Sequence, residues 1–151
     1  MPEKETLERA KQDKREGKAA STQAGEFERE EIEHVREGKH GARSTKQAIA
    51  IGLSKARRAG VKLAPPEQGK TSPETREQAR LDIKKGKSAG KGTVSAKRSL
   101  ASSRALKREG HSAASRTALS RHARGAAAKR SAASRSRSAK KAAATRKRQE
   151  A

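Results

Sequence analysis

The stretch Ser44–Gly60, STKQAIAIGLSKARRAG, carries the clearest fold signal in this chain of 151 residues. Its first four residues, S-T-K-Q, fit a capping box, in which two side chains satisfy free amides at the start of a helix. The apolar residues Ile49, Leu53 and Ala56 then follow the i, i+4, i+7 spacing of one helical face. The closing glycine suits a C-terminal cap. The stretch therefore predicts an amphipathic helix over about residues 45–59.

A second amphipathic helix is predicted just upstream, over about residues 22–37. Its six glutamates contrast with the purely basic helix that follows, so pairing the two relieves like-charge repulsion. The two helices predict a mostly α protein with a small antiparallel hairpin module over residues 20–63, which is marginally stable alone because its seam is small. The expected seam consists of Phe27, Ile32, Val35, Ile49, Leu53, Val61 and Leu63.

The segments on either side of the hairpin resemble each other. ETLERAKQDKREGK at 5–18 aligns without gaps with ETREQARLDIKKGK at 74–87, and seven of the 14 positions are identical. We interpret residues 1–19 as a marginal charged helix and residues 64–90 as a linker that repeats the N-terminal segment. Pro73 suits the first turn of the second copy.

The tail, residues 91–151, has another composition, with 18 Lys or Arg, 17 Ala and 11 Ser among its 61 residues. Ala, Lys and Arg favour helix, but three leucines are its largest apolar side chains and the cations repel one another. We therefore expect a largely disordered, helix-prone polycationic tail.

The composition excludes a single packed domain of this length. Leu, Ile, Val and Phe number 15 of 151 residues and the net charge is +22, which is typical of chains with little core. We expect no enzyme, cofactor or small-molecule substrate. We also expect no metal site, because Cys is absent and the four His follow no metal-binding pattern. No apolar run approaches the roughly 20 residues of a membrane span, and the N-terminus lacks a secretory pattern, so we expect a cytoplasmic protein.

The charge is unevenly distributed, with a net of −3 over 1–37, +7 over 38–63, +2 over 64–90 and +16 over 91–151. Such a tail predicts a polyanionic partner, DNA first and RNA as the alternative. With one Phe and no Tyr, Trp or Asn, the chain lacks stacking platforms and a common base-reading side chain. We therefore predict histone-like binding to the phosphate backbone, without sequence specificity.

The candidate contacts lie in and beside the basic hairpin helix and in the tail. They are Lys39, Arg43, Lys46, Lys55, Arg57, Arg58, Lys62, Lys97, Arg98, Arg104, Lys107, Arg108, Arg116, Arg121, Arg124, Lys129, Arg130, Arg135, Arg137, Lys140, Lys141, Arg146, Lys147 and Arg148.

The core at 44–60, with the preceding REGKHGAR and the opening ERAKQDKREGKAASTQAGEF, resembles a family of small basic bacterial proteins of unknown function. The resemblance covers roughly residues 1–66 and implies a bacterial, cytosolic protein without an established activity. The tail separately resembles the Lys/Ala/Ser-rich arms of linker histones and bacterial histone-like proteins, which implies a place in the nucleoid.

A second interpretation remains open. Residues 1–63 would form a protein-interaction module, and the basic tail would tether it to RNA, ribosomes or another polyanion. The hairpin is also a candidate surface for a homodimer.

Overall fold

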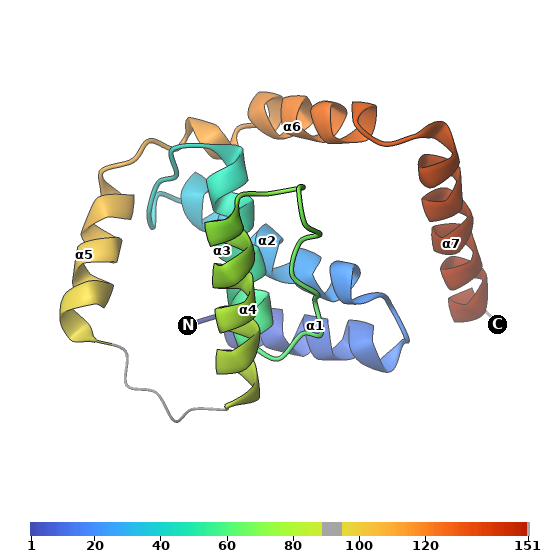
Figure 1. Ribbon diagram of the computed structural model, residues 1–151, viewed down its shortest axis with the longest axis horizontal. Helices are drawn as coiled ribbons and strands as arrows, with labels where there is room; N and C mark the ends of the chain where they lie inside the picture. The colour runs from blue at the N-terminus through green and yellow to red at the C-terminus, as the bar shows by residue number, and fades with distance from the viewer. Residues whose placement is uncertain (89–94, 151) are drawn as a thin grey trace.

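Helices make up all the regular secondary structure of the residues that the computed structural model describes, 1–88 and 95–150. This confirms the mostly α prediction, and Figure 1 shows the arrangement. In chain order the elements are α1 (Lys4–Arg15), α2 (Ala20–Arg36), α3 (Thr45–Arg58), α4 (Pro73–Lys87), α5 (Ala96–Lys107), the single 3-10 turn η1 (Ser112–Ala114), α6 (Arg116–Ala128) and α7 (Ala132–Glu150).

The predicted hairpin is present as α2 and α3, which pack against each other more extensively than any other pair of described elements. Ser44 caps α3, and its hydroxyl accepts a hydrogen bond from the amide of Gln47 at 3.2 Å. The side chain of Gln47 reaches back to the amide of Arg43 at 2.7 Å, one residue before the expected cap amide. Gly38 and Gly60 follow the two helices with φ of 74° and 89°, a conformation that favours glycine.

The core is small and divides into two clusters. The first consists of Ala10, Ala24, Phe27 and Ala56, with Leu7, Leu53, Val61 and Leu63 packed against them. The second consists of Val35, Ala42, Ala48, Ala113 and Ala114, with Ile32 packed against them. The expected seam residues therefore enter the core, except Ile49, which lines a hollow between α3 and α4.

The two copies of the internal repeat flank the hairpin, because α1 packs on α2 and α4 packs on α3. Two repeat positions are buried in both copies, whereas Thr6 is buried and its counterpart Thr75 is exposed. Ala10 and Ala79 are 6% and 3% exposed, and Asp13 and Asp82 are 8% and 1% exposed. The segment expected as a linker thus contributes a helix to the folded body.

The expectation of a largely disordered tail is wrong for the described residues, since 96–107, 116–128 and 132–150 are helical. None of these three helices has a buried residue, so their helicity rests on the high helix propensity of Ala, Lys and Arg rather than on packing. The predicted boundary at residues 90 and 91 falls within 89–94, outside the described residues.

The tail meets the hairpin through η1. Ala113 and Ala114 are small enough to enter the second core cluster. Their carbonyl oxygens accept hydrogen bonds from Thr45 Oγ1 at 2.6 Å and from Arg36 Nε at 2.9 Å. This contact holds the start of α6 next to α3. Hydrophobic periodicity did not predict it, because the only apolar residues that the tail contributes to it are two alanines.

Replacing either of two glycines inside the hairpin helices by alanine is expected to change the stability of the protein in opposite directions. A Cβ at Gly52 in α3 would lie 2.7 Å from Glu28 Cα, whereas a Cβ at Gly25 in α2 would meet nothing within 4 Å. We expect Gly25→Ala to stabilise the protein by about 0.5–1 kcal/mol through helix propensity. Gly52→Ala should destabilise it by about 1–3 kcal/mol because the helices must separate. Urea denaturation followed by circular dichroism compares the two, and a stabilising Gly52→Ala would contradict the close helix packing.

Candidate nucleic-acid interface

The 24 predicted contact residues fall into two groups, which differ in how far they are engaged in contacts within the folded body. Four of the seven in residues 38–63 are engaged within the folded body. Lys39 lies 3.1 Å from Glu3 and 3.0 Å from Glu37. Arg58 Nε donates to Asp82 at 2.7 Å.

The other two engaged residues, Lys55 and Arg57, lie deeper. Lys55 Nζ lies 2.9 Å from Glu30 and also contacts Glu31. Burial acts to lower the pKa of Lys55, but its hydrogen bonds to Glu31 and Glu30 prevail and raise it. Arg57 is 8% exposed and donates to the carbonyl of Ala64 at 3.3 Å. These side chains serve the packing of α3 against its neighbours.

Arg43, Lys46 and Lys62 are exposed, and none of them forms an ion pair with a carboxylate of the described residues. They lie at the start of α3 and beyond its end, so they do not form a continuous stripe with Lys55. The predicted basic face of this helix is therefore interrupted by internal ion pairs.

The seventeen predicted contacts of residues 95–150 are all exposed. Across the described chain the ion pairs join residues within 3–82, and no Lys or Arg of α5, α6 or α7 takes part in one. The ion pairs of the described residues thus lie within the body, where some cations such as Arg43, Lys46 and Lys62 also stay unpaired, whereas no cation of the C-terminal helices pairs with a described carboxylate.

Helix α6 gathers three of these cations around one hollow of its surface. Arg116, Arg121 and Arg124, with the hydroxyls of Thr117 and Ser120, line an open hollow on its surface. Guanidinium groups donate in a fork that matches phosphate oxygens, and hydroxyls add further donors. This arrangement can hold phosphates without reading bases.

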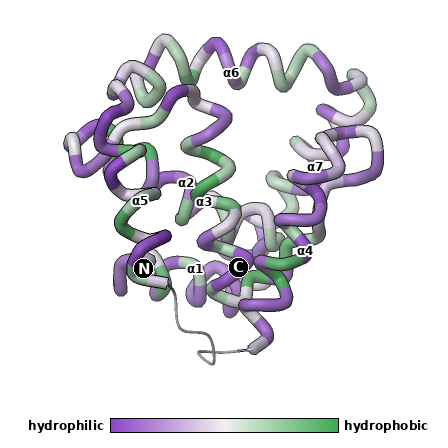
Figure 2. The backbone as a smooth tube through the Cα atoms, turned by 60° about the vertical axis from the view of Figure 1, so that its left-hand side comes forward, coloured by the Kyte–Doolittle hydropathy of each residue, from purple (hydrophilic) through white to green (hydrophobic). Residues whose placement is uncertain are grey.

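The three C-terminal helices extend around the body and contact it at a few points. In Figure 1, α5 lies on one side of the hairpin, α6 crosses above it and α7 descends on the far side. The amide of Gln149 donates to Glu16 at 3.0 Å, which ties the end of α7 to the loop after α1. Figure 2 shows hydrophilic residues recurring along α6 and α7. Cations are therefore presented on several sides of one molecule.

Sequence reasoning missed that Glu30 and Glu31 are buried, at 2% and 1% exposed. A signal was present, because both follow Phe27 at the i+3 and i+4 positions of the apolar face. The pKa of Glu30 is lowered: burial opposes the shift, but hydrogen bonds from Lys55 and from the amide of Glu3 outweigh it. Glu30 is held as a carboxylate within the hairpin.

These features define an all-α protein with a small hairpin core and exposed cationic helices. Residues 11–68 match the model of a family of unknown function (DUF6496), which supports the predicted similarity to an uncharacterised family. No curated protein and no solved structure matches the chain. No helix of the described residues is long and apolar enough to cross a membrane.

Proposed function

We propose that this protein binds duplex DNA through the phosphate backbone without sequence preference, as histone-like, nucleoid-associated proteins of bacteria do. The observation that carries the proposal is the segregation of its cations. Every ion pair of the described residues lies within the body, while the exposed cations of residues 95–150 lack carboxylate partners among the described residues.

The driving force in this proposal is counterion release. Each Lys or Arg that neutralises a phosphate frees condensed salt ions from the duplex, which favours binding without any base contact. A double-stranded RNA offers a similar phosphate array, so it competes with DNA for the same side chains. The helical structure of α5, α6 and α7 also fixes the distances between successive cations along each helix.

The proposal is tested by removing the α6 arginines in the full chain. We expect Arg116→Gln, Arg121→Gln and Arg124→Gln together to weaken binding to duplex DNA about tenfold at 100 mM salt, because each exposed ion pair contributes up to about 1 kcal/mol. Fluorescence anisotropy with a labelled duplex measures the loss.

The matched control removes the same charge elsewhere. Lys4, Lys11 and Lys14 are exposed residues of α1, and none forms an ion pair with a described carboxylate. Changing all three to Gln should weaken DNA binding by less than about threefold if the contact is made by α5–α7. Equal losses in the two triple variants would mean that only net charge matters, and would contradict an interface on α6.

A hollow between α3 and α4 favours the second candidate function, a protein-interaction module. It encloses about 560 Å³ and includes the apolar side chains of Ile49, Leu53 and Ala79. Under this alternative, binding to duplex DNA disappears at 150 mM salt in the wild-type chain, and the tail only supplements contacts made by the body.

A further inference from the structure

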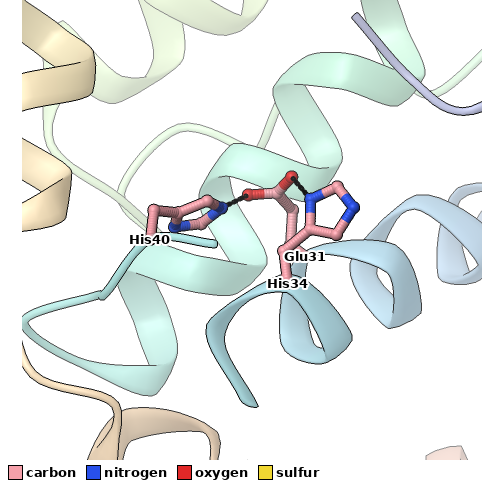
Figure 3. Close-up of side chains that lie close together, drawn as sticks. All are labelled: Glu31, His34 and His40. Carbon is pink, nitrogen blue, oxygen red and sulfur yellow. Dashed lines mark ion pairs between the residues drawn. The ribbon is translucent and has the colours of Figure 1, made fainter. Parts of the chain in front are cut away.

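The end of α2 and the loop that follows it bring together Glu31, His34 and His40. One ligand atom from each of these residues lies within 4.8 Å of the others. Figure 3 shows both imidazole rings turned toward the carboxylate of Glu31, one from each side. His40 Nε2 lies 3.3 Å from Glu31 Oε2, and His34 Nδ1 lies 3.8 Å from Glu31 Oε1.

The carboxylate of Glu31 is incompletely satisfied. The residue is 1% exposed, and its Oε2 has no hydrogen-bond partner among the described residues. Lys55 contacts Oε1 as an ion pair, but it also pairs with Glu30 at 2.9 Å. A buried carboxylate oxygen without a hydrogen-bond donor is costly, so Oε2 favours a cation next to the rings.

In each imidazole ring, the nitrogen that faces away from Glu31 (the outer nitrogen) already has a hydrogen-bond acceptor. His34 Nε2 lies 2.9 Å from Glu3 Oε1, and His40 Nδ1 lies 3.0 Å from the carbonyl oxygen of Gly41. Each of these nitrogens therefore carries the proton and donates it. A ring that carries only this proton directs the lone pair of its inner nitrogen at Glu31, which is repulsive unless a positive charge lies between them. Metal-binding histidines are oriented by this same outer hydrogen bond to a carboxylate or a backbone carbonyl.

The charge around the cluster also suits a divalent cation. Contacts connect Glu31 to three further carboxylates, those of Glu3, Glu30 and Glu37, and to the ammonium groups of Lys39 and Lys55. Four carboxylates and two ammonium groups leave a net charge of −2 when both rings are neutral. A divalent ion neutralises this charge without displacing Lys55 from Glu30.

We propose that Glu31, His34 and His40 bind a divalent transition-metal ion of the zinc class. Two imidazoles and one carboxylate are ligands that Zn²⁺ takes, and imidazole disfavours Mg²⁺ and Ca²⁺. The separation of His40 Nε2 and Glu31 Oε2, 3.3 Å, is close to the spacing of about 3.3 Å that tetrahedral geometry and bonds near 2 Å impose on two zinc ligands. The ion would fasten the loop at 37–44 to α2, next to the start of α3. This site does not depend on the DNA-binding proposal, because none of its residues belongs to α5–α7.

The test is a titration of the metal-free full chain with Zn²⁺ in competition with a chromophoric chelator. We expect one equivalent to bind. His34→Ala with His40→Ala should weaken this binding by at least about 100-fold, more than the loss usually seen for outer hydrogen-bond partners. The matched control, His111→Ala with His122→Ala, removes two histidines outside the cluster and should bind like the wild type. Glu3→Gln, which replaces the acceptor of His34 and also removes the ion pair of Glu3 with Lys39, should weaken binding about tenfold.

A second variant and a spectrum separate ligation from folding. His34→Gln with His40→Gln keeps polar side chains of similar reach, so it should retain helical circular dichroism while losing Zn²⁺ affinity. Co²⁺ bound to the wild type should show the intense visible absorption of four-coordinate cobalt, which both double variants at positions 34 and 40 should lack. Unchanged Zn²⁺ affinity in either of those variants, or a wild-type dissociation constant weaker than about 100 μM, overturns the proposal.

Discussion

Phe27→Ala is expected to unfold the helical body. Phe27 is 1% exposed and is the largest side chain fully buried in the described residues. It joins α1, α2 and α3 in the first core cluster, where the other buried residues are alanines. Truncating a buried Phe typically costs about 3–5 kcal/mol, and the rest of this core offers few large side chains to compensate. Small domains have total stabilities of about 5–15 kcal/mol, so the loss removes much of what holds the helices together.

Urea denaturation followed by far-ultraviolet circular dichroism measures this effect. Leu100→Ala is the control, because Leu100 is 52% exposed on α5 and its loss should change the unfolding free energy by less than about 0.5 kcal/mol. If Phe27→Ala and Leu100→Ala cost the same, the first core cluster does not hold the body together.

Lys55→Ala is expected to cause the second large loss in the free energy of unfolding. Its ammonium group faces two carboxylates that are 2% and 1% exposed, those of Glu30 and Glu31. Removing one partner of a buried ion pair costs about 3–5 kcal/mol because a charge is left uncompensated. We expect Lys55→Ala to lower the free energy of unfolding by about 3 kcal/mol. This is the lower limit of that range, because the Lys55 side chain is itself 23% exposed.

Lys62→Ala provides the matched control, since Lys62 is exposed beyond α3 and pairs with no described carboxylate. It should change the unfolding free energy by less than about 0.5 kcal/mol. Adding Glu30→Gln to Lys55→Ala should restore part of the stability, because a neutral amide replaces one unpaired charge. If Lys55→Ala alone destabilises the protein and adding Glu30→Gln restores no stability, then Lys55 contributes packing rather than charge.

The hairpin was predictable from the sequence because its signals are local. The capping residue Ser44 and the apolar spacing of α3 each act within one or two turns, and Ser72 and Pro73 fix the start of α4 in the same way. The burial of Ala10, Asp13 and their repeat counterparts was not predictable, because it depends on which faces α1 and α4 turn toward the hairpin.

The tail was misjudged for a related reason. Counting large apolar residues predicts no core contact there, yet Ala113 and Ala114 pack where little space exists, and their carbonyls find donors on α2 and α3. The histidine cluster escaped detection as well. Its members are spaced by three and six residues, and a turn at Gly38 brings His40 back toward α2. Contacts made by small residues and loops leave no periodic trace in a sequence.

Phosphate-backbone binding by the exposed cations should appear as a steep salt dependence of duplex DNA binding by the full chain. Seventeen exposed Lys and Arg side chains lie in residues 95–150, and one duplex cannot meet all of them at once. If about 10 phosphates are neutralised, log K against log salt concentration should fall with a slope near −9. A slope shallower than about −3 would contradict the account.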